Sequence, residues 1–275
     1  MRSVTPMSAV RHRVPVLCLS ASLLVILLAG ASGAQIPGEL SYRQYRDLAW
    51  AADRLDHMAQ FEPVEGEAGM CFAIAERFGT VQVLRMSARG TEQIWKSNQL
   101  GGIPEEVLAA DLSGDGLDDA LVCRTSNGKI YAWDLESYNL VWESLAGEFT
   151  VVTCFTTANV DDDPQAEIVM IADNRIIYVD GVNFTKEFTS ISEYRATMIR
   201  CGDVDGDRRM EIVLNSGQVV DSGSGDVEWE DETFFGRIEV LDIDGDLIPE
   251  VVTENEGGGP VKVFDVDYRS EVRFQ

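Results

Sequence analysis

The sequence has little histidine and cysteine: two histidines, five cysteines and no Cys-x-x-Cys pair. Structural zinc sites are built from clusters of these residues, so a zinc centre is not expected. Basic side chains are also scarce, with 22 Lys and Arg against 47 Asp and Glu and a formal net charge of −25. Such a chain repels nucleic acid and anionic membranes, and it attracts cations or basic partners.

Acidic residues are absent from residues 1–34, which contain Arg2, Arg11 and Arg13. An apolar stretch over residues 14–28 follows this basic leader, and small residues fill positions 31–34. This order is typical of a cleaved signal peptide, with an uncleaved signal anchor as the alternative. We therefore expect a protein that is secreted or located in the periplasm or cell envelope, touching a membrane only if the anchor is retained.

Four cysteines lie beyond the leader: Cys71, Cys123, Cys154 and Cys201. In an exported protein they could form two disulfides in three alternative connectivities. Each lies in or beside a hydrophobic run that resembles a strand, which favours buried free thiols.

Residues 35–66 differ in texture from the rest of the chain. Between residues 39 and 60 the apolar side chains recur at helical spacing, at Leu40, Leu48, Ala52, Leu55 and Met58. This pattern predicts one amphipathic helix, followed by a short linker.

From residue 67 onward, short β-branched runs alternate with turns rich in Gly, Asn and Asp, which predicts an all-β fold. The same strand-like tail occurs five times, and its aromatic residues are separated by 47, 46, 41 and 45 residues. These residues are Trp95, Trp142, Phe188, Trp229 and Phe274. A period near 45 residues with about four strands per unit is typical of β-propeller blades. We therefore predict a propeller of about five four-stranded blades over residues 67–275, with ring closure left open. The first repeat could lack its innermost strand, for which residues 61–64 are a candidate.

A second repeated element precedes the last four tails. It occupies residues 111–119, 159–167, 203–211 and 242–250, here called the 111, 159, 203 and 242 loops, and an apolar run follows each copy. Oxygen-bearing side chains recur at positions 1, 3, 5 and 9, and we expect the backbone carbonyl at position 7 to add a ligand. Ca²⁺ binds six to eight such hard oxygens, so the spacing predicts two to four calcium ions.

The predicted ligands of the 111 loop are Asp111, Ser113, Asp115, Leu117 and Asp119. Those of the 159 loop are Asn159, Asp161, Asp163, Gln165 and Glu167. Those of the 203 loop are Asp203, Asp205, Asp207, Arg209 and Glu211. Those of the 242 loop are Asp242, Asp244, Asp246, Ile248 and Glu250.

Two alternatives compete with this interpretation. An EF-hand requires an acid at position 12 and flanking helices, whereas these loops have Val122, Met170, Leu214 and Thr253 at that position, between strands. An acidic turn without metal suits a single copy better than four copies in register. The 203 and 242 loops have complete acid sets, the 111 loop replaces one acid with Ser113, and the 159 loop begins with Asn159 and contains Pro164. We expect the 159 loop to bind most weakly.

The repeated loops resemble the FG-GAP/VCBS repeats of integrin-like propellers, in which such a hairpin joins the first two strands of a blade. Tails such as residues 128–134 and 140–143 are also similar to PQQ-type propeller repeats. The combined resemblance covers residues 70–275 and implies a rigid calcium-stiffened platform. It leaves the partner open.

Three functions are compatible with this resemblance. The first is a protein- or glycan-interaction and adhesion module of the cell exterior or envelope, with structural calcium. The second is a calcium-dependent polysaccharide lyase or hydrolase, for which Arg195 and Arg200 are the basic pair nearest an inner strand, although we favour a rim ion pair with nearby acids as their role. The third is an envelope assembly scaffold. We favour the non-enzymatic module, because fold alone does not determine function.

Overall fold

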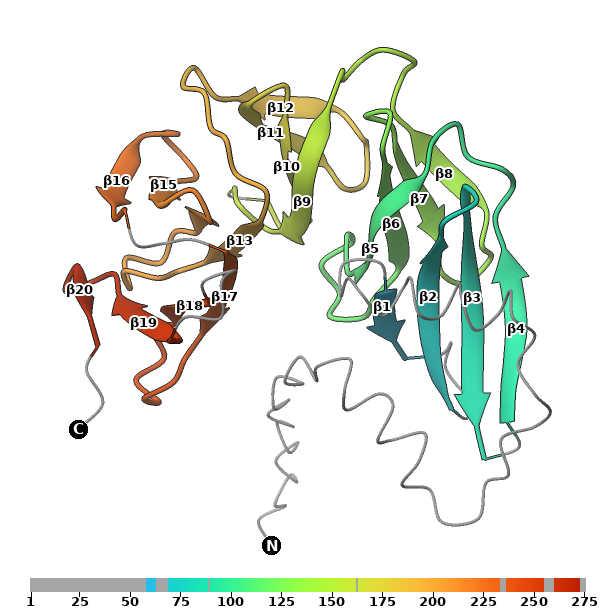
Figure 1. Cartoon of the computed structure of the whole chain (residues 1–275), viewed down its shortest axis with the longest axis horizontal. Helices are drawn as coiled ribbons and strands as arrows, with labels where there is room; N and C mark the ends of the chain where they lie inside the picture. Colours follow the sequence, from blue (N-terminus) through green and yellow to red (C-terminus); the bar gives the residue numbers. More distant parts are fainter. Residues whose placement is uncertain are drawn as a thin grey trace, which may run out of the picture. The chain divides into compact units, whose positions relative to one another are not determined.

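The computed structural model describes residues 58–62, 69–88, 90–161, 163–232, 236–254 and 260–272. These residues form twenty β-strands in five four-stranded antiparallel sheets, and they contain no helix (Figure 1). The prediction of an all-β fold with five four-stranded units is therefore confirmed. No helix in this part of the chain is long and apolar enough to span a membrane.

Each sheet is built from four strands that are consecutive in the sequence. The first sheet contains β1 (Met58–Phe61), β2 (Met70–Glu76), β3 (Thr80–Ser87) and β4 (Gly90–Lys96). The second contains β5 (Pro104–Ala110), β6 (Ala120–Thr125), β7 (Ile130–Asp134) and β8 (Leu140–Glu143). The third contains β9 (Val152–Ala158), β10 (Glu167–Ala172), β11 (Arg175–Asp180) and β12 (Lys186–Thr189). The fourth contains β13 (Ile199–Gly202), β14 (Glu211–Leu214), β15 (Gln218–Asp221) and β16 (Val227–Glu230). The fifth contains β17 (Arg237–Leu241), β18 (Glu250–Glu254), β19 (Lys262–Asp265) and β20 (Ser270–Glu271).

The hydrophobic core is divided among the four junctions between consecutive sheets. One buried cluster combines side chains of the first and second sheets, and others join the second to the third, the third to the fourth, and the fourth to the fifth. Every residue of β6, β10 and β14 is buried, because these second strands are covered on both faces. This explains why their sequences are continuous apolar runs rather than alternating ones.

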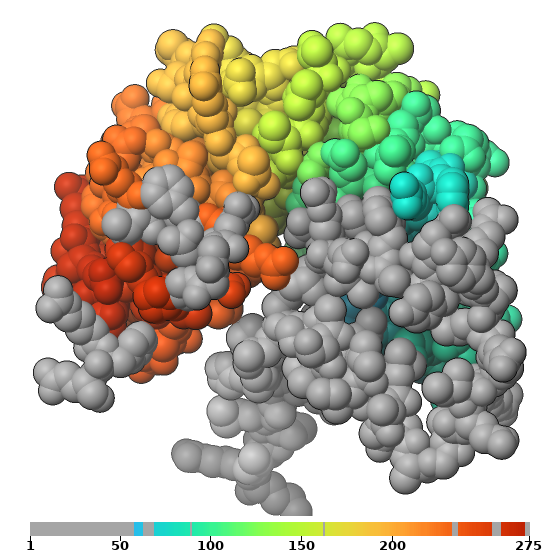
Figure 2. Space-filling view, in the orientation of Figure 1, coloured from blue at the N-terminus to red at the C-terminus, as the bar shows by residue number. Residues whose placement is uncertain are grey.

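Successive sheets contact one another through their first strands, β1 with β5, β5 with β9, β9 with β13, and β13 with β17. Figure 2 shows the coloured surface passing without a break from the second sheet to the fifth. Within the described residues the row of sheets is not closed into a ring, which answers the question that the sequence left open.

The aromatic residues of the repeated tails, here called the outer aromatic residues, pack against a turn of the following sheet. The ring of Tyr138 stacks on Trp95 with centroids 5.3 Å apart, and the ring of Phe184 stacks on Trp142 at 5.2 Å. Tyr138 and Phe184 have φ angles of 56° and 54°, in the left-handed region that side-chain-bearing residues seldom adopt. At the next junction the corresponding residue is Gly225, where an added Cβ would lie 2.7 Å from the Phe188 ring.

An aspartate at the end of the third strand fixes this turn in the second to fifth sheets. The side chains of Asp134, Asp180, Asp221 and Asp265 each accept a hydrogen bond from the backbone N–H three residues later. Asx turns of this kind hold the chain without help from other segments. The repeated aspartate is therefore a turn determinant, a role that the sequence analysis did not assign.

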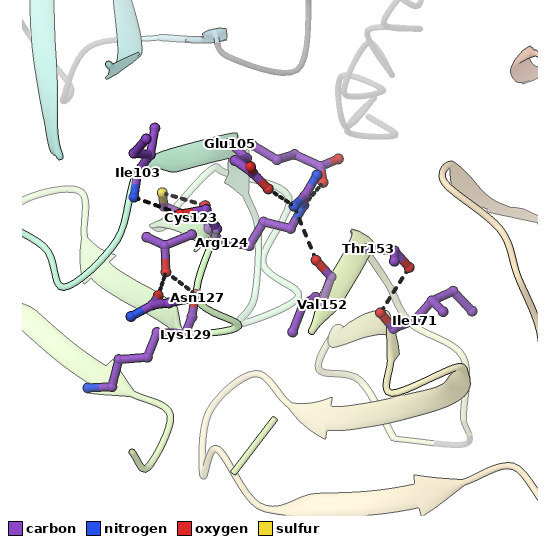
Figure 3. Close-up of polar contacts among 12 residues, drawn as sticks. Ile103, Glu105, Cys123, Arg124, Asn127, Lys129, Val152, Thr153 and Ile171 are labelled. Carbon is purple, nitrogen blue, oxygen red and sulfur yellow. Dashed lines mark hydrogen bonds and ion pairs between the residues drawn. The ribbon is translucent and has the colours of Figure 1, made fainter. Parts of the chain in front are cut away.

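A buried ion-pair network joins the second and third sheets (Figure 3). Arg124 on β6 donates to Glu106 and Glu105 on β5, each at 2.7 Å, and its guanidinium also donates to the Val152 carbonyl of β9 at 3.1 Å. The negative charge of Glu106, followed by that of Glu105, keeps the pKa of Arg124 raised against the opposing effect of burial. Because the arginine is almost fully buried, these partners are needed to offset the free-energy cost of burying its charge.

Several predictions about the chain termini need correction or fall outside the described residues. The innermost strand of the first sheet is Met58–Phe61, not residues 61–64. The predicted helix over residues 39–60 is therefore wrong at residues 58–60, which belong to β1. Ala59 and Phe61 of this strand pack into the core between the first and second sheets. The rest of that helix, the signal peptide and Phe274 lie outside the described residues.

The four cysteines beyond the leader form no disulfide among the described residues, and all but the half-buried Cys201 are buried, as the hydrophobic runs around them favoured. Burial raises the pKa of the Cys123 thiol, and it raises that of Cys154 to about 12. Both thiols are thus held in the protonated form.

Candidate metal centres

The four acidic loops occupy equivalent places in the second to fifth sheets. Each joins the first strand of its sheet to the second, from β5 to β6, β9 to β10, β13 to β14 and β17 to β18. The acid at position 9 comes at or just before the start of the buried second strand. This placement follows from the sequence, since each loop runs directly into an apolar segment.

One hydrogen bond closes every loop in the same way. The carboxylate at position 9 accepts the backbone N–H of position 2, at 2.8–2.9 Å. The four pairs are Asp119 with Leu112, Glu167 with Val160, Glu211 with Val204, and Glu250 with Ile243. Position 9 is therefore a structural acid in all four copies, with one oxygen committed to the backbone.

A second shared bond fixes position 7. Its backbone N–H donates to the carboxylate at position 5, at 2.7–2.9 Å. The residues at position 7 are Leu117, Gln165, Arg209 and Ile248, and those at position 5 are Asp115, Asp163, Asp207 and Asp246. The ligand role expected for the position 7 carbonyl stays a prediction.

Carboxylates converge in three of the four loops. In each group, one oxygen from every member lies within 4.8 Å of the others. The groups are Asp161, Asp163 and Glu167; Asp203, Asp205 and Glu211; and Asp242, Asp244 and Asp246. These are the possible metal-binding clusters among the described residues.

The 159 loop contains the most buried acid of the set. Glu167 is 0% exposed, and its Oε1 atom has no hydrogen-bond partner among the described residues. Burial, and after it the nearby charges of Asp161 and Asp163, raise the pKa of Glu167 to about 7. An unpaired carboxylate oxygen at this depth costs free energy unless something satisfies it.

The 203 loop has a similar arrangement. Oδ1 of Asp203 is buried and without a hydrogen-bond partner among the described residues. Burial raises the pKa of Glu211 to about 8, with further contributions from the charges of Asp205 and Glu228. Asp207 lies outside the converging group and accepts the N–H of Arg209 at 2.7 Å.

The 242 loop is more open to solvent. Its three converging aspartates are all exposed, and Glu250 closes the loop without joining them. Leu247 occupies position 6 with a φ of 79° and is 87% exposed, so an apolar side chain stands in a left-handed turn at the loop tip.

The 111 loop uses its acids on its own backbone. Asp111 accepts N–H bonds from Gly114, Asp115 and Gly116, and Asp119 accepts them from Leu112 and Ser113. Ser113 also donates its hydroxyl to Asp111 at 3.4 Å. The sequence favoured the 111 loop over the 159 loop, whereas the structure brings carboxylates together in the 159 loop.

Two further acids lie beside the loops and were not predicted. Glu187 on β12 is close enough to Asp161 for that charge to contribute, after burial, to its raised pKa. Glu228 on β16 has a pKa raised by burial and then by Asp205, and its Oε2 atom is buried without a partner among the described residues. Each directly precedes the aromatic residue of its repeated tail. This shared position is the sequence signal that could have identified both acids.

Of the two arginines considered for lyase chemistry, one is held in an ion pair and the other is exposed. Arg200 donates to Glu239 of the next sheet through Nε and Nη2, at 3.0 and 2.9 Å. Arg195 is exposed. The alternative of a rim ion pair therefore describes Arg200.

No protein-family model matches this chain, and no curated protein matches it in sequence. Among solved structures it is similar to Sqt1 of Saccharomyces cerevisiae, with a TM-score of 0.58 and 13% identity, covering 76% of this chain and 58% of that one. It is also similar to the V. cholerae biofilm matrix protein Bap1, with a TM-score of 0.49 and 18% identity, covering 76% of this chain and 37% of that one. The chain thus spans less than two thirds of either protein, and the likeness to Sqt1 shows the fold alone.

Proposed function

We propose that this chain is an exported calcium-binding repeat protein of the FG-GAP/VCBS type that serves as an interaction or adhesion module. The observation that carries the proposal is the Oε1 atom of Glu167, which is buried without a hydrogen-bond partner among the described residues, on a carboxylate that has an oxygen within 4.8 Å of oxygens of Asp161 and Asp163. Buried polar atoms of native proteins are satisfied in more than about nine cases out of ten. A cation held between these three carboxylates satisfies the orphaned oxygen and removes their mutual repulsion.

The chemistry of the donor set fits calcium. The three converging groups offer carboxylate oxygens and no sulfur or imidazole, which suits a hard divalent cation. Asp161, Asp163 and Glu167 would hold one ion, Asp203, Asp205 and Glu211 a second, and Asp242, Asp244 and Asp246 a third. The bound ion supplies positive charge that ties each loop to the start of its second strand, a structural role.

An interaction role is the second part of the proposal. The outer strands expose apolar side chains, including Leu140 and Val141 on β8 and Val227 on β16, each 45–50% exposed. Such side chains on a rigid set of sheets suit a protein or glycan partner outside the cell or in the envelope. The ion pair of Arg200 with Glu239 favours this module over the lyase alternative.

The metal claim is tested by calcium titration calorimetry together with thermal melting in Ca²⁺, Mg²⁺ and EDTA. We expect binding heat for calcium and a melting temperature that falls in EDTA. No heat and an unchanged melting temperature would overturn the proposal.

The remaining claims have their own assays. N-terminal sequencing of the protein recovered from the envelope or medium tests export. A glycan array and a pull-down from native envelope extract then distinguish a glycan partner from a protein partner or an assembly scaffold.

A further inference from the structure

A single buried serine connects the 159 loop with the 203 loop. Ser222 follows β15 and is only 4% exposed. Its hydroxyl donates to the Val160 carbonyl of the 159 loop at 2.9 Å, and its backbone N–H donates to the Met210 carbonyl of the 203 loop at 3.1 Å. Tyr178 donates its hydroxyl to the carbonyl of Ser222 at 3.1 Å, so the serine is held from three sides.

The serine joins two segments that position the closing glutamates. Val160 donates its N–H to Glu167 at 2.8 Å, while its carbonyl accepts from Ser222. Met210 immediately precedes Glu211, which accepts the N–H of Val204 at 2.8 Å. Three hydrogen bonds and one peptide bond therefore connect Glu167 of the 159 loop to Glu211 of the 203 loop.

The corresponding junctions on either side are built differently. Between the 111 and 159 loops, Gly181 occupies the place of Ser222, and Ala166 donates directly to the Leu112 carbonyl at 3.1 Å. Between the 203 and 242 loops, Val266 occupies that place and Pro249 takes the position of Ala166. Valine has no hydroxyl and proline has no N–H, so neither bond can form there.

We propose that Ser222 couples the 159 and 203 loops, so that a cation bound in one loop raises the cation affinity of the other. The inference rests on the proposed calcium binding. A bound ion fixes Glu167 and therefore Val160, which holds Ser222 in place and with it the residue before Glu211. The second ion then orders a loop whose mobility is already reduced, and its binding costs less conformational entropy. The 242 loop binds without this link.

The test uses the full chain with the other two loops disabled by Asp115→Asn and Asp244→Asn. Calorimetry gives the calcium dissociation constant of the 203 loop with the 159 loop intact and with it disabled by Asp161→Asn. Allosteric couplings usually begin at about fivefold, and we expect disabling the 159 loop to raise the constant about tenfold. In the Ser222→Ala background we expect the same change to have an effect of about twofold or less.

Two control variants keep the result specific. Ser224→Ala removes an exposed hydroxyl from the same turn and should leave the coupling intact. Ser222→Thr retains the hydroxyl at the coupling position and should also leave the coupling intact. If Ser222→Ala does not fold, Ser222→Gly provides the same test, because glycine stands at this place in the preceding sheet.

The outcomes separate the two proposals. No calcium heat in the starting protein overturns both of them. Calcium binding with the same 203-loop constant in both forms overturns the coupling alone. A positive coupling that persists in Ser222→Ala overturns the role of the serine and assigns the effect to another contact between the loops.

Discussion

We expect the replacement of Glu167 with glutamine to stabilise the protein in the absence of calcium and to destabilise it when calcium is bound. In wild-type protein one oxygen of this buried carboxylate accepts the Val160 N–H, and the other has no partner among the described residues. Glutamine keeps the shape of the side chain, removes the charge and adds an amide N–H₂ that can donate to Asp161 or Asp163.

The magnitude follows from burial. A buried unsatisfied polar group costs about 1–3 kcal/mol, so we expect Glu167→Gln in EDTA to raise the free energy of unfolding by about 1 kcal/mol. A ligand at a hundred times its dissociation constant stabilises the native state by about 2.7 kcal/mol. The variant loses that contribution for this site, so in calcium it should be less stable than wild type by about 2 kcal/mol.

Thermal melting of both proteins in EDTA and in saturating calcium measures the effect. For a chain of this size, 1 kcal/mol corresponds to a melting shift of about 2–4 °C. The variant should therefore melt slightly above wild type in EDTA and several degrees below it in calcium. A difference of the same sign and size under both conditions refutes the argument, because it would show that no cation satisfies the buried oxygen.

Three further predictions concern the packing of the sheets. Arg124→Ala removes the cation that pairs with Glu105 and Glu106 and should lower the free energy of unfolding by about 3 kcal/mol in urea titration; a change below about 1 kcal/mol contradicts a buried pair. Gly225→Ala combines a left-handed φ of 71° with a contact to an aromatic ring, so it should cost about 2–3 kcal/mol. Gly147→Ala has similar φ but open space around it and should cost only about 1 kcal/mol. Cys123 and Cys154 should react with a thiol reagent at pH 8 only after denaturant is added, because burial raises the pKa of both thiols; rapid reaction of the native protein contradicts this.

The repeating part of the fold could be predicted from the sequence because each unit carries its own signals. The spacing of Trp95, Trp142, Phe188 and Trp229 gave the period, and continuous apolar runs marked strands that neighbouring sheets cover on both faces. The first strand was placed at residues 61–64 instead of 58–61 because Met58 fits the helical spacing of the apolar residues before it. Its pairing with Ala73 and Cys71 on β2 decides between the two, and no local pattern contains that information.

Which loops bring carboxylates together could not be predicted from the loop sequences. Asn159 and Pro164 placed the 159 loop below the 111 loop, but Asp111 accepts hydrogen bonds from its own loop, where Gly114 and Gly116 adopt left-handed φ angles of 79° and 89°. In the 159 loop the strand that follows is fully buried, which carries Glu167 into the interior. Burial, rather than the number of acids, leaves Oε1 of Glu167 without a partner among the described residues.

The sequence by itself determined the repeat length, the positions of the acids and the excess of negative charge, because these are properties of residues close together in the chain. Only the tertiary structure decided which carboxylates converge and which oxygens have partners. It also brought Ser222 to the Val160 carbonyl, 62 residues away. The physical reason is that burial and hydrogen bonding between sheets are made by segments far apart in the sequence, and they form only when consecutive sheets pack face to face.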